Sequence, residues 1–242
     1  DVYFDYDEKG NTRFLSIRFR PQYQYLDQNK EAEERIYEGE TPGVSYGDIA
    51  ERYYTVGQYM KEVKDVSKAM AAAGDSYICD EYLNAMGSPE AESVYVLHDL
   101  NNDGIEEFFI GLKFNYDIPY YVIYDVYTWK DGRAYQLMRG IGYRNGSCKI
   151  CENGVIEDNY SGSAWDGQTL YHILPEGGIE LETIDSVSSR RDGTVQSYYH
   201  WNELIDENSL QTILEQYQPE SVTYVDCNRE TIEQLRLSGI RK

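Results

Sequence analysis

The sequence predicts an α+β fold, in which a large curved antiparallel β-meander sheet packs with one long helix and shorter helices. Two observations lead to this fold class. A series of alternating segments between residues 94 and 201 is separated by turn dipeptides such as Asp131-Gly132 and Asn153-Gly154. No helical pattern of about ten residues interrupts that series, which favours antiparallel hairpins over βαβ units.

The N-terminal part is expected to be separate from the main domain. Residues 2–6 and 12–20 alternate around a turn that contains Gly and Asn, which predicts a β-hairpin. Residues 27–44 are strongly charged and end in Pro-Gly, so we expect a surface linker with some helical content. The expected domains are residues 1–45, a hairpin with an acidic linker, and residues 46–242, the α+β domain.

The clearest helical pattern runs from Tyr46 to Ala73. Ser45 and Asp48 resemble a capping box at its start, and Gly74 supplies a stop. Apolar residues recur at three- and four-residue steps and form one stripe, which is typical of a helix packed on a sheet. A partner-binding helix is the alternative use of this stripe. Its members are Ile49, Tyr53, Val56, Met60, Val63, Val66 and Met70.

Shorter helices are expected at residues 77–86, at Ser209–Tyr217 with Asn208 as the N-cap, and at Arg229–Leu237. The strands that alternation and turn dipeptides predict are Val94–His98, Ile105–Leu112, Tyr120–Trp129, Ala134–Gly140, Ser147–Cys151, Val155–Tyr160, Thr169–Leu174, Leu181–Val187 and Val195–Trp201.

Composition excludes several classes of protein. Lys+Arg 22 against Asp+Glu 43 gives a net charge of −21, which repels nucleic acids and anionic membranes. No apolar run approaches the roughly 18 residues of a membrane span. The 25 Tyr, 6 Phe and 3 Trp residues are too many aromatic residues for a disordered chain.

The compartment is expected to be extracellular. The chain begins at Asp1 without a charged-then-apolar leader, so we expect a mature form from which a secretion signal has been removed. Its four cysteines are too few for a disulfide scaffold. Cys148 and Cys151 form a CxxC within a predicted strand, where three-residue spacing points the side chains to opposite faces, so two unrelated cysteines are expected.

The loop from Asp99 to Glu107 is the candidate metal site. Its oxygen-bearing side chains fall at positions 1, 3, 5 and 9, which brings alternate ligands inward around a hard cation such as calcium. Gly at position 6 permits the sharp bend. The predicted ligands are Asp99, Asn101, Asp103, the carbonyl oxygen of Ile105, and Glu107 directly or through water. The alternative is a hydrogen-bonded Asx-rich hairpin without a metal.

Position 12 of this loop is Ile110, and the residues after Glu107 alternate like a strand, so the loop does not belong to an EF-hand. It resembles the strand-loop-strand calcium loop of integrin-type propellers, and its first half is similar to dockerin loops. The expected role of the ion is structural.

A wider resemblance covers residues 46–218. The segments YVLHDLNNDGIEEFFIGL, YDVYTWKDGRAYQL, CENGVIEDNYSGS with LYHIL, and NELIDENSLQTILEQY together resemble uncharacterised secreted or lipid-anchored proteins of Gram-positive anaerobes. That resemblance implies an extracellular or cell-surface location, attachment to the membrane only through a removed lipoprotein leader, and the calcium-like loop. It implies no catalytic activity.

Aromatic residues give a second candidate site. In the strand Tyr120–Trp129, alternation places Tyr121, Tyr127 and Trp129 on one face. An exposed aromatic face stacks on sugar rings or contacts a protein partner, so these three residues are the candidate ligand-binding residues. Ordinary cross-strand aromatic pairs are the alternative.

Three functions are compatible with these features. The first is a non-catalytic, calcium-stabilised extracellular domain that binds a carbohydrate or a surface protein through aromatic residues. The second is an extracellular glycan hydrolase that uses an Asp/Glu pair, which the 43 acidic residues leave open. The third is a purely structural domain. No pattern for a nucleophilic hydrolase is present in the sequence.

Overall fold

The structure, a computed structural model, describes residues 2–6, 12–17, 36–40, 45–73, 78–142, 148–161, 165–175, 179–188, 195–201 and 203–238. The chain divides into two units, Asp1–Glu34 and Arg35–Lys242. In the first unit, β1 (Val2–Tyr6) pairs antiparallel with β2 (Thr12–Ile17), which confirms the predicted hairpin. Its turn lies outside the described residues.

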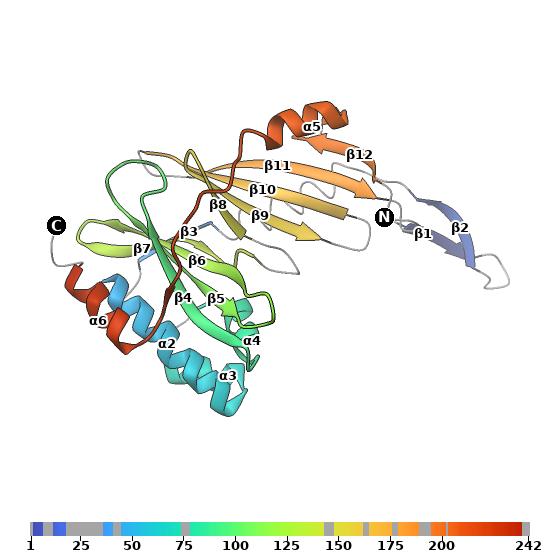
Figure 1. Cartoon of the computed structure of the whole chain (residues 1–242). Helices are drawn as coiled ribbons and strands as arrows, with labels where there is room; N and C mark the ends of the chain where they lie inside the picture. The colour runs from blue at the N-terminus through green and yellow to red at the C-terminus, as the bar shows by residue number, and fades with distance from the viewer. Residues whose placement is uncertain are drawn as a thin grey trace. The chain divides into compact units, whose positions relative to one another are not determined.

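Two six-stranded antiparallel sheets form the second unit (Figure 1). The first sheet has the order β14-β4-β5-β6-β7-β3, and the second has the order β13-β12-β11-β10-β9-β8. The bounds in the first sheet are β3 Ile36–Glu40, β4 Ala91–His98, β5 Glu107–Phe114, β6 Tyr120–Lys130, β7 Arg133–Arg139 and β14 Val225–Asp226. Those in the second are β8 Cys148–Cys151, β9 Val155–Ser161, β10 Trp165–Ile173, β11 Ile179–Ser188, β12 Val195–His200 and β13 Glu203–Ile205.

All nine strands predicted between residues 94 and 201 are therefore present, but the expectation of one large sheet is wrong. After β7 the chain leaves the first sheet at Gly140 and Gly142, whose φ values of 68° and 75° lie in the left-handed region. The free edge of β7 is taken by β3 instead. Since β3 occupies residues 36–40, that part of the expected linker belongs to the sheet.

Among the described residues there are five helices: α2 Tyr46–Val63, α3 Val66–Ala73, α4 Asp80–Met86, α5 Glu207–Leu214 and α6 Arg229–Ser238. The single helix expected from Tyr46 to Ala73 is wrong, because Lys64 adopts a left-handed φ of 52° and ends α2. The Asp65 side chain then accepts a hydrogen bond from the backbone N–H of Lys68 at 3.1 Å. A local Asp cap, rather than any loss of the apolar stripe, divides the helix in two.

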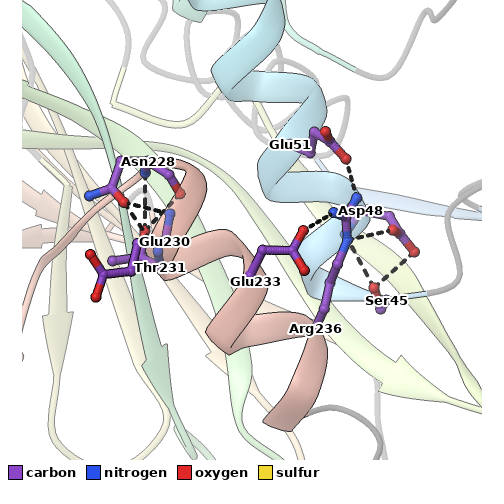
Figure 2. Close-up of polar contacts among 8 residues, drawn as sticks. All are labelled: Ser45, Asp48, Glu51, Asn228, Glu230, Thr231, Glu233 and Arg236. Carbon is purple, nitrogen blue, oxygen red and sulfur yellow. Dashed lines mark hydrogen bonds and ion pairs between the residues drawn. The ribbon is translucent and has the colours of Figure 1, made fainter.

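Side-chain caps set the helix starts. Ser45 is the N-cap of α2, and its Oγ accepts from the backbone N–H of Asp48, as predicted. The N-cap of α5 is Asp206 rather than the expected Asn208, so this helix begins two residues before the predicted start. Asn228 accepts from the N–H groups of Glu230 and Thr231 at the start of α6 (Figure 2).

The helices cover the two sheets separately. Helices α2, α4 and α6 pack on the first sheet, where Ile49, Tyr53, Val56 and Met60 of the predicted stripe are buried in one core cluster with strand residues. Helix α5 packs on the second sheet through Leu210 and lies beside β12 in Figure 1. The stripe of α2 is thus core rather than a free partner-binding surface.

One arginine joins α6 to α2 (Figure 2). Arg236 Nε lies 3.1 Å from Asp48 Oδ1, its Nη1 donates to Glu233 at 2.7 Å, and its Nη2 donates to Glu51. Gly47 lies directly opposite, and a Cβ placed there would meet Arg236 Cγ at 2.3 Å. The two helices therefore approach closely only because residue 47 has no side chain.

Candidate functional site

The predicted metal loop connects β4 to β5 at one end of the first sheet. Asn102 and Gly104 have left-handed φ values of 59° and 87°, so the chain reverses sharply over residues 99–106. The bend expected at Gly104 is confirmed. Glu107 begins β5, in agreement with the strand predicted to follow the loop.

The acidic and amide side chains of this loop fold back onto its own backbone. Asp99 accepts from the N–H groups of Asp103 and Gly104 at 3.1 and 3.0 Å. Asp103 Oδ1 accepts from Ile105 N–H at 2.7 Å, and Asn101 Oδ1 lies 3.3 Å from Asp103 N. Carboxylate and amide oxygens are the ligand types of hard cations, and here they accept hydrogen bonds from the backbone of the loop itself.

Glu107 differs from the other predicted ligands. Its side chain is 1% exposed, Oε2 accepts from Leu100 N–H at 3.0 Å, and Oε1 accepts from the Thr128 hydroxyl at 3.0 Å. Burial, together with the nearby charge of Asp103, raises the pKa of Glu107 to about 7. Within the described ranges, no group of three or more His, Cys, Asp or Glu side chains is placed to hold a metal ion.

The loop also contacts the second sheet. Asn101 Nδ2 donates to the carbonyl oxygen of Leu174, the residue after β10, at 3.1 Å. Gly154, in the β8–β9 turn, lies so close that an added Cβ would be 3.4 Å from Leu100 O. His98, the last residue of β4, lies 2.9 Å from Glu220, whose backbone N–H bonds to Ile150 in β8. This end of the first sheet is therefore attached to the second sheet at several points.

A pocket of about 110 Å³ opens beside the loop. The Tyr46 hydroxyl donates to the carbonyl oxygen of Glu106 at 2.8 Å, and the rings of Tyr46 and Trp129 meet edge to face with centroids 5.7 Å apart. The lining residues come from the loop, β4, β6, α2 and α6, and they are Tyr46, Leu97, Ile105, Glu106, Trp129, Leu235 and Ser238.

The predicted ligand-binding residues of β6 do not share one face. The register between β5 and β6 shifts between Ile110 and Gly111, which leaves Tyr124 as an extra residue on β6. A β-bulge of this kind moves every later side chain to the other face. Tyr121 therefore faces away from the helices and stacks on Tyr224 at 4.0 Å.

Tyr127 and Trp129 face the helices. Tyr127 is 1% exposed and lies 2.9 Å from the Tyr53 hydroxyl, which donates to the fully buried Asp125. Trp129 packs against the same core cluster and lines the pocket. Of the three predicted residues, Trp129 alone lines the described pocket, and Tyr127 is part of the core.

Two exposed tyrosines, Tyr116 and Tyr120, stack with the buried Phe114 at the β5–β6 turn instead. The rings of Phe114, Tyr116 and Tyr120 stack with centroids 4.8 to 6.2 Å apart and interplanar angles of 15° or less. Tyr116 is 49% exposed, Tyr120 47% and Ile118 83%. We name Phe114, Tyr116, Ile118 and Tyr120 the aromatic platform. Sequence alternation missed it because Tyr116 lies in a turn, where no period of two applies.

A polar cluster on the second sheet was also missed. His172 on β10 and His200 on β12 lie 2.9 and 2.6 Å from the two oxygens of Glu182 on β11, and the Tyr217 hydroxyl donates to the same carboxylate at 2.6 Å. Burial disfavours the Glu182 carboxylate, yet hydrogen bonds from His172, Tyr217 and His200 outweigh it and lower its pKa to about 2. The pairing of three strands, which spacing alone does not reveal, brings these residues together.

Two buried carboxylates bear on the hydrolase alternative. Glu157 on β9 and Glu182 on β11 both pair with Leu170 on β10, so they lie on one face with roughly 10 Å between their Cα atoms. Leu170 is fully buried between them and packs in the cluster that includes Leu210 of α5. Apolar packing fills the space between the two strands at this level.

All four cysteines lie in the described residues, where they are buried and form no disulfide bond. Cys151 joins the α5-side core cluster, whereas the Cys148 side chain lies near Gly142 on the opposite face of β8. The expectation of two unrelated cysteines in this CxxC is confirmed for the described geometry.

Comparison of the chain with protein-family models, with curated proteins and with solved structures found no match. In the part of the chain that the structure describes, no helix is long and apolar enough to cross a membrane.

Proposed function

We propose that this chain is a non-catalytic domain at the cell exterior, stabilised by a calcium ion in the loop from Asp99 to Glu107. The observation that carries the proposal is the position of the loop. It connects two strands of the first sheet, and its Asn101 side chain donates a hydrogen bond to the carbonyl oxygen of Leu174 at the end of β10 in the second sheet. An ion held by the Asp99, Asn101 and Asp103 side chains fixes that loop and with it the junction of the two sheets.

Several features support calcium over other ions. The donors are carboxylate and amide oxygens, which are the ligands of hard cations. Asp99, Asn101 and Asp103 each accept a hydrogen bond from a backbone N–H of the loop, which holds their side-chain oxygens beside its left-handed bend at Gly104. Both oxygens of Glu107 already accept a hydrogen bond, from Leu100 N–H and from the Thr128 hydroxyl. Glu107 would therefore complete the calcium ligands through a water molecule, or directly after its bond to Thr128 is broken. An extracellular site of this class binds calcium with a dissociation constant of about 0.1 to 1 mM.

Thermal unfolding of EDTA-treated protein, titrated with calcium, tests the ion. A site with a dissociation constant of about 0.1 mM, in about 1 mM calcium, adds about 1.4 kcal/mol to the free energy of unfolding. For a unit of this size, that corresponds to a rise of roughly 3 to 6 °C in the unfolding midpoint. Magnesium is the control ion, because it demands a stricter octahedral geometry. The substitution Asp103→Ala is expected to remove the rise, and Asp117→Ala, at an exposed position in the β5–β6 turn, to retain it. Calcium affinity that survives in Asp103→Ala would falsify the loop assignment.

We further propose that the aromatic platform is the surface through which the domain binds a carbohydrate or a protein. Tyr116 and Tyr120, the two exposed rings of this near-parallel stack, offer apolar area on which sugar rings and partner side chains pack. The net charge of −21 repels anionic polymers, so the expected ligand is neutral or basic.

A further inference from the structure

The pocket beside the metal loop has walls of two kinds. Tyr46 and Trp129 form an aromatic corner, and Leu97, Ile105 and Leu235 complete an apolar lining. Phe108 stacks behind Tyr46 at 5.2 Å and holds its ring in place. A volume of about 110 Å³ suits a group of only a few heavy atoms, since an apolar cavity of about 150 Å³ takes one benzene molecule.

The charge at this pocket is negative. Glu106 lines it, and among the described residues its carboxylate has no hydrogen-bond or ion-pair partner. Burial is the main cause of the raised pKa of Tyr46, and the neighbouring acidic residues Glu107, Glu106 and Asp103 add to it.

Arg236, the arginine next to the pocket residue Leu235, does not neutralise the negative charge of the pocket. Arg236 follows Leu235 in α6, but its guanidinium is held by Asp48, Glu51 and Glu233 (Figure 2). Three carboxylates around one guanidinium leave that end of α2 and α6 acidic as well.

Aromatic faces, a small apolar volume and one unpartnered carboxylate together favour one chemistry. A metal ion needs several oxygen ligands, an anion is repelled, and an uncharged apolar group leaves Glu106 without a role. An alkylated ammonium group is attracted to aromatic faces and to the carboxylate while its methyl or methylene groups fill the apolar space. We propose that this pocket binds the ammonium head of a small organic cation, with Tyr46 and Trp129 as the aromatic walls and Glu106 as the counter-ion.

Calorimetric titration in EDTA, where the metal loop is unoccupied, tests this pocket independently of the calcium proposal. The probes are choline, its uncharged isostere 3,3-dimethylbutan-1-ol, and butylammonium. Choline is expected to bind in the millimolar range and at least tenfold more tightly than the alcohol. Tighter binding of butylammonium than of choline also supports the ammonium site and points to a lysine side chain as the source of the ligand.

Two matched variants locate the charge. Glu106→Gln is expected to weaken choline binding by about five- to tenfold, whereas Glu92→Gln, at an exposed position on β4, leaves it unchanged. Trp129→Leu, which retains an apolar wall, is expected to weaken choline more than the alcohol. Equal affinity for choline and the alcohol, or equal losses in Glu106→Gln and Glu92→Gln, would overturn the proposal. Neither result bears on whether calcium raises the unfolding midpoint, so the ammonium proposal and the calcium proposal can be refuted independently.

Discussion

Asn101 donates a hydrogen bond from Nδ2 to the backbone carbonyl of Leu174 at 3.1 Å and so connects the β4–β5 loop to the end of β10. The same side chain holds Asp103 through a second bond from Nδ2 at 3.2 Å. One amide thus orders the loop internally and fixes it to the other sheet.

Replacing Asn101 with Ala is expected to destabilise the metal-free protein by about 1 kcal/mol, because the Leu174 carbonyl loses its partner. Chemical unfolding in EDTA measures this loss without any contribution from an ion. Asn84→Ala, at an exposed position on α4, is the matched control and is expected to change stability by less than about 0.5 kcal/mol. Equal stability of the Asn101 variant and the parent protein would show that this hydrogen bond does not contribute to the junction of the two sheets.

Gly47 tests the close approach of α2 and α6. An added Cβ would meet not only the side chain of Arg236 but its backbone N and Cα, at 3.0 and 3.2 Å, so Gly47→Ala is expected to cost about 2 to 3 kcal/mol. Gly57 offers a matched comparison, because its nearest neighbour is the flexible Met86 Cε at 2.8 Å. Gly57→Ala is expected to cost about 1 kcal/mol. Urea unfolding of both variants gives the order, and a larger cost at Gly57 would contradict the rigid α2–α6 contact.

Asp125 is expected to make stability fall as the pH rises. Burial raises its pKa to about 6 despite hydrogen bonds from Tyr53 and Gly140, whereas the carboxyl of an unfolded chain titrates near 3.9. The folded state binds the extra proton between these values, so its stability decreases from about pH 4 to pH 6, by up to roughly 3 kcal/mol. Asp125→Asn keeps an acceptor for Tyr53 and is expected to flatten that decrease. An identical pH profile for the variant would refute the assignment.

Glu182 is expected to act with the opposite sign. Its folded-state pKa of about 2 lies below the model-peptide value of about 4.3, so the stability it contributes is fully present above about pH 4.3 and is lost as the pH falls towards 2. Glu182→Gln is expected to lower stability by about 2 kcal/mol at pH 7 and by little at pH 2. Unfolding midpoints at both pH values check this, and a constant deficit would mean that the carboxylate charge has no part in the cluster.

These elements show which features local sequence can predict. The strands between residues 94 and 201 were predicted from alternation and from turn dipeptides, of which Asp131-Gly132 and Asn153-Gly154 do lie between strands. The loop bend at Gly104 was predicted from one glycine among acidic residues. The division into two sheets depends on two left-handed glycines after β7 and on the pairing of the distant β3. Neither leaves a periodic signal, so the sequence was consistent with one sheet.

The candidate sites depend on register in the same way. A single extra residue, Tyr124, moves Tyr121 away from Tyr127 and Trp129, which reverses the face that alternation assigns. His172, Glu182 and His200 meet only because three strands pair with a particular offset. Such offsets are fixed by packing and turn geometry along the whole strand rather than by the spacing of the residues that meet.

The aromatic platform supports a prediction about ligand binding. Tyr120 stacks on Phe114 at 4.8 Å and on Tyr116 at 5.8 Å, while half of its surface remains open. Removing its ring takes away both the stacking area and the support for Tyr116. Tyr120→Ala is therefore expected to weaken binding to a neutral polysaccharide by about tenfold or more, with little loss of stability.

Leu204→Ser, at a 69% exposed position on β13, is the control for a general loss of apolar surface. Affinity electrophoresis through gels that contain neutral polysaccharides, with calcium present, compares the variants directly. Equal retardation of the Tyr120 and Leu204 variants would place the carbohydrate elsewhere on the domain.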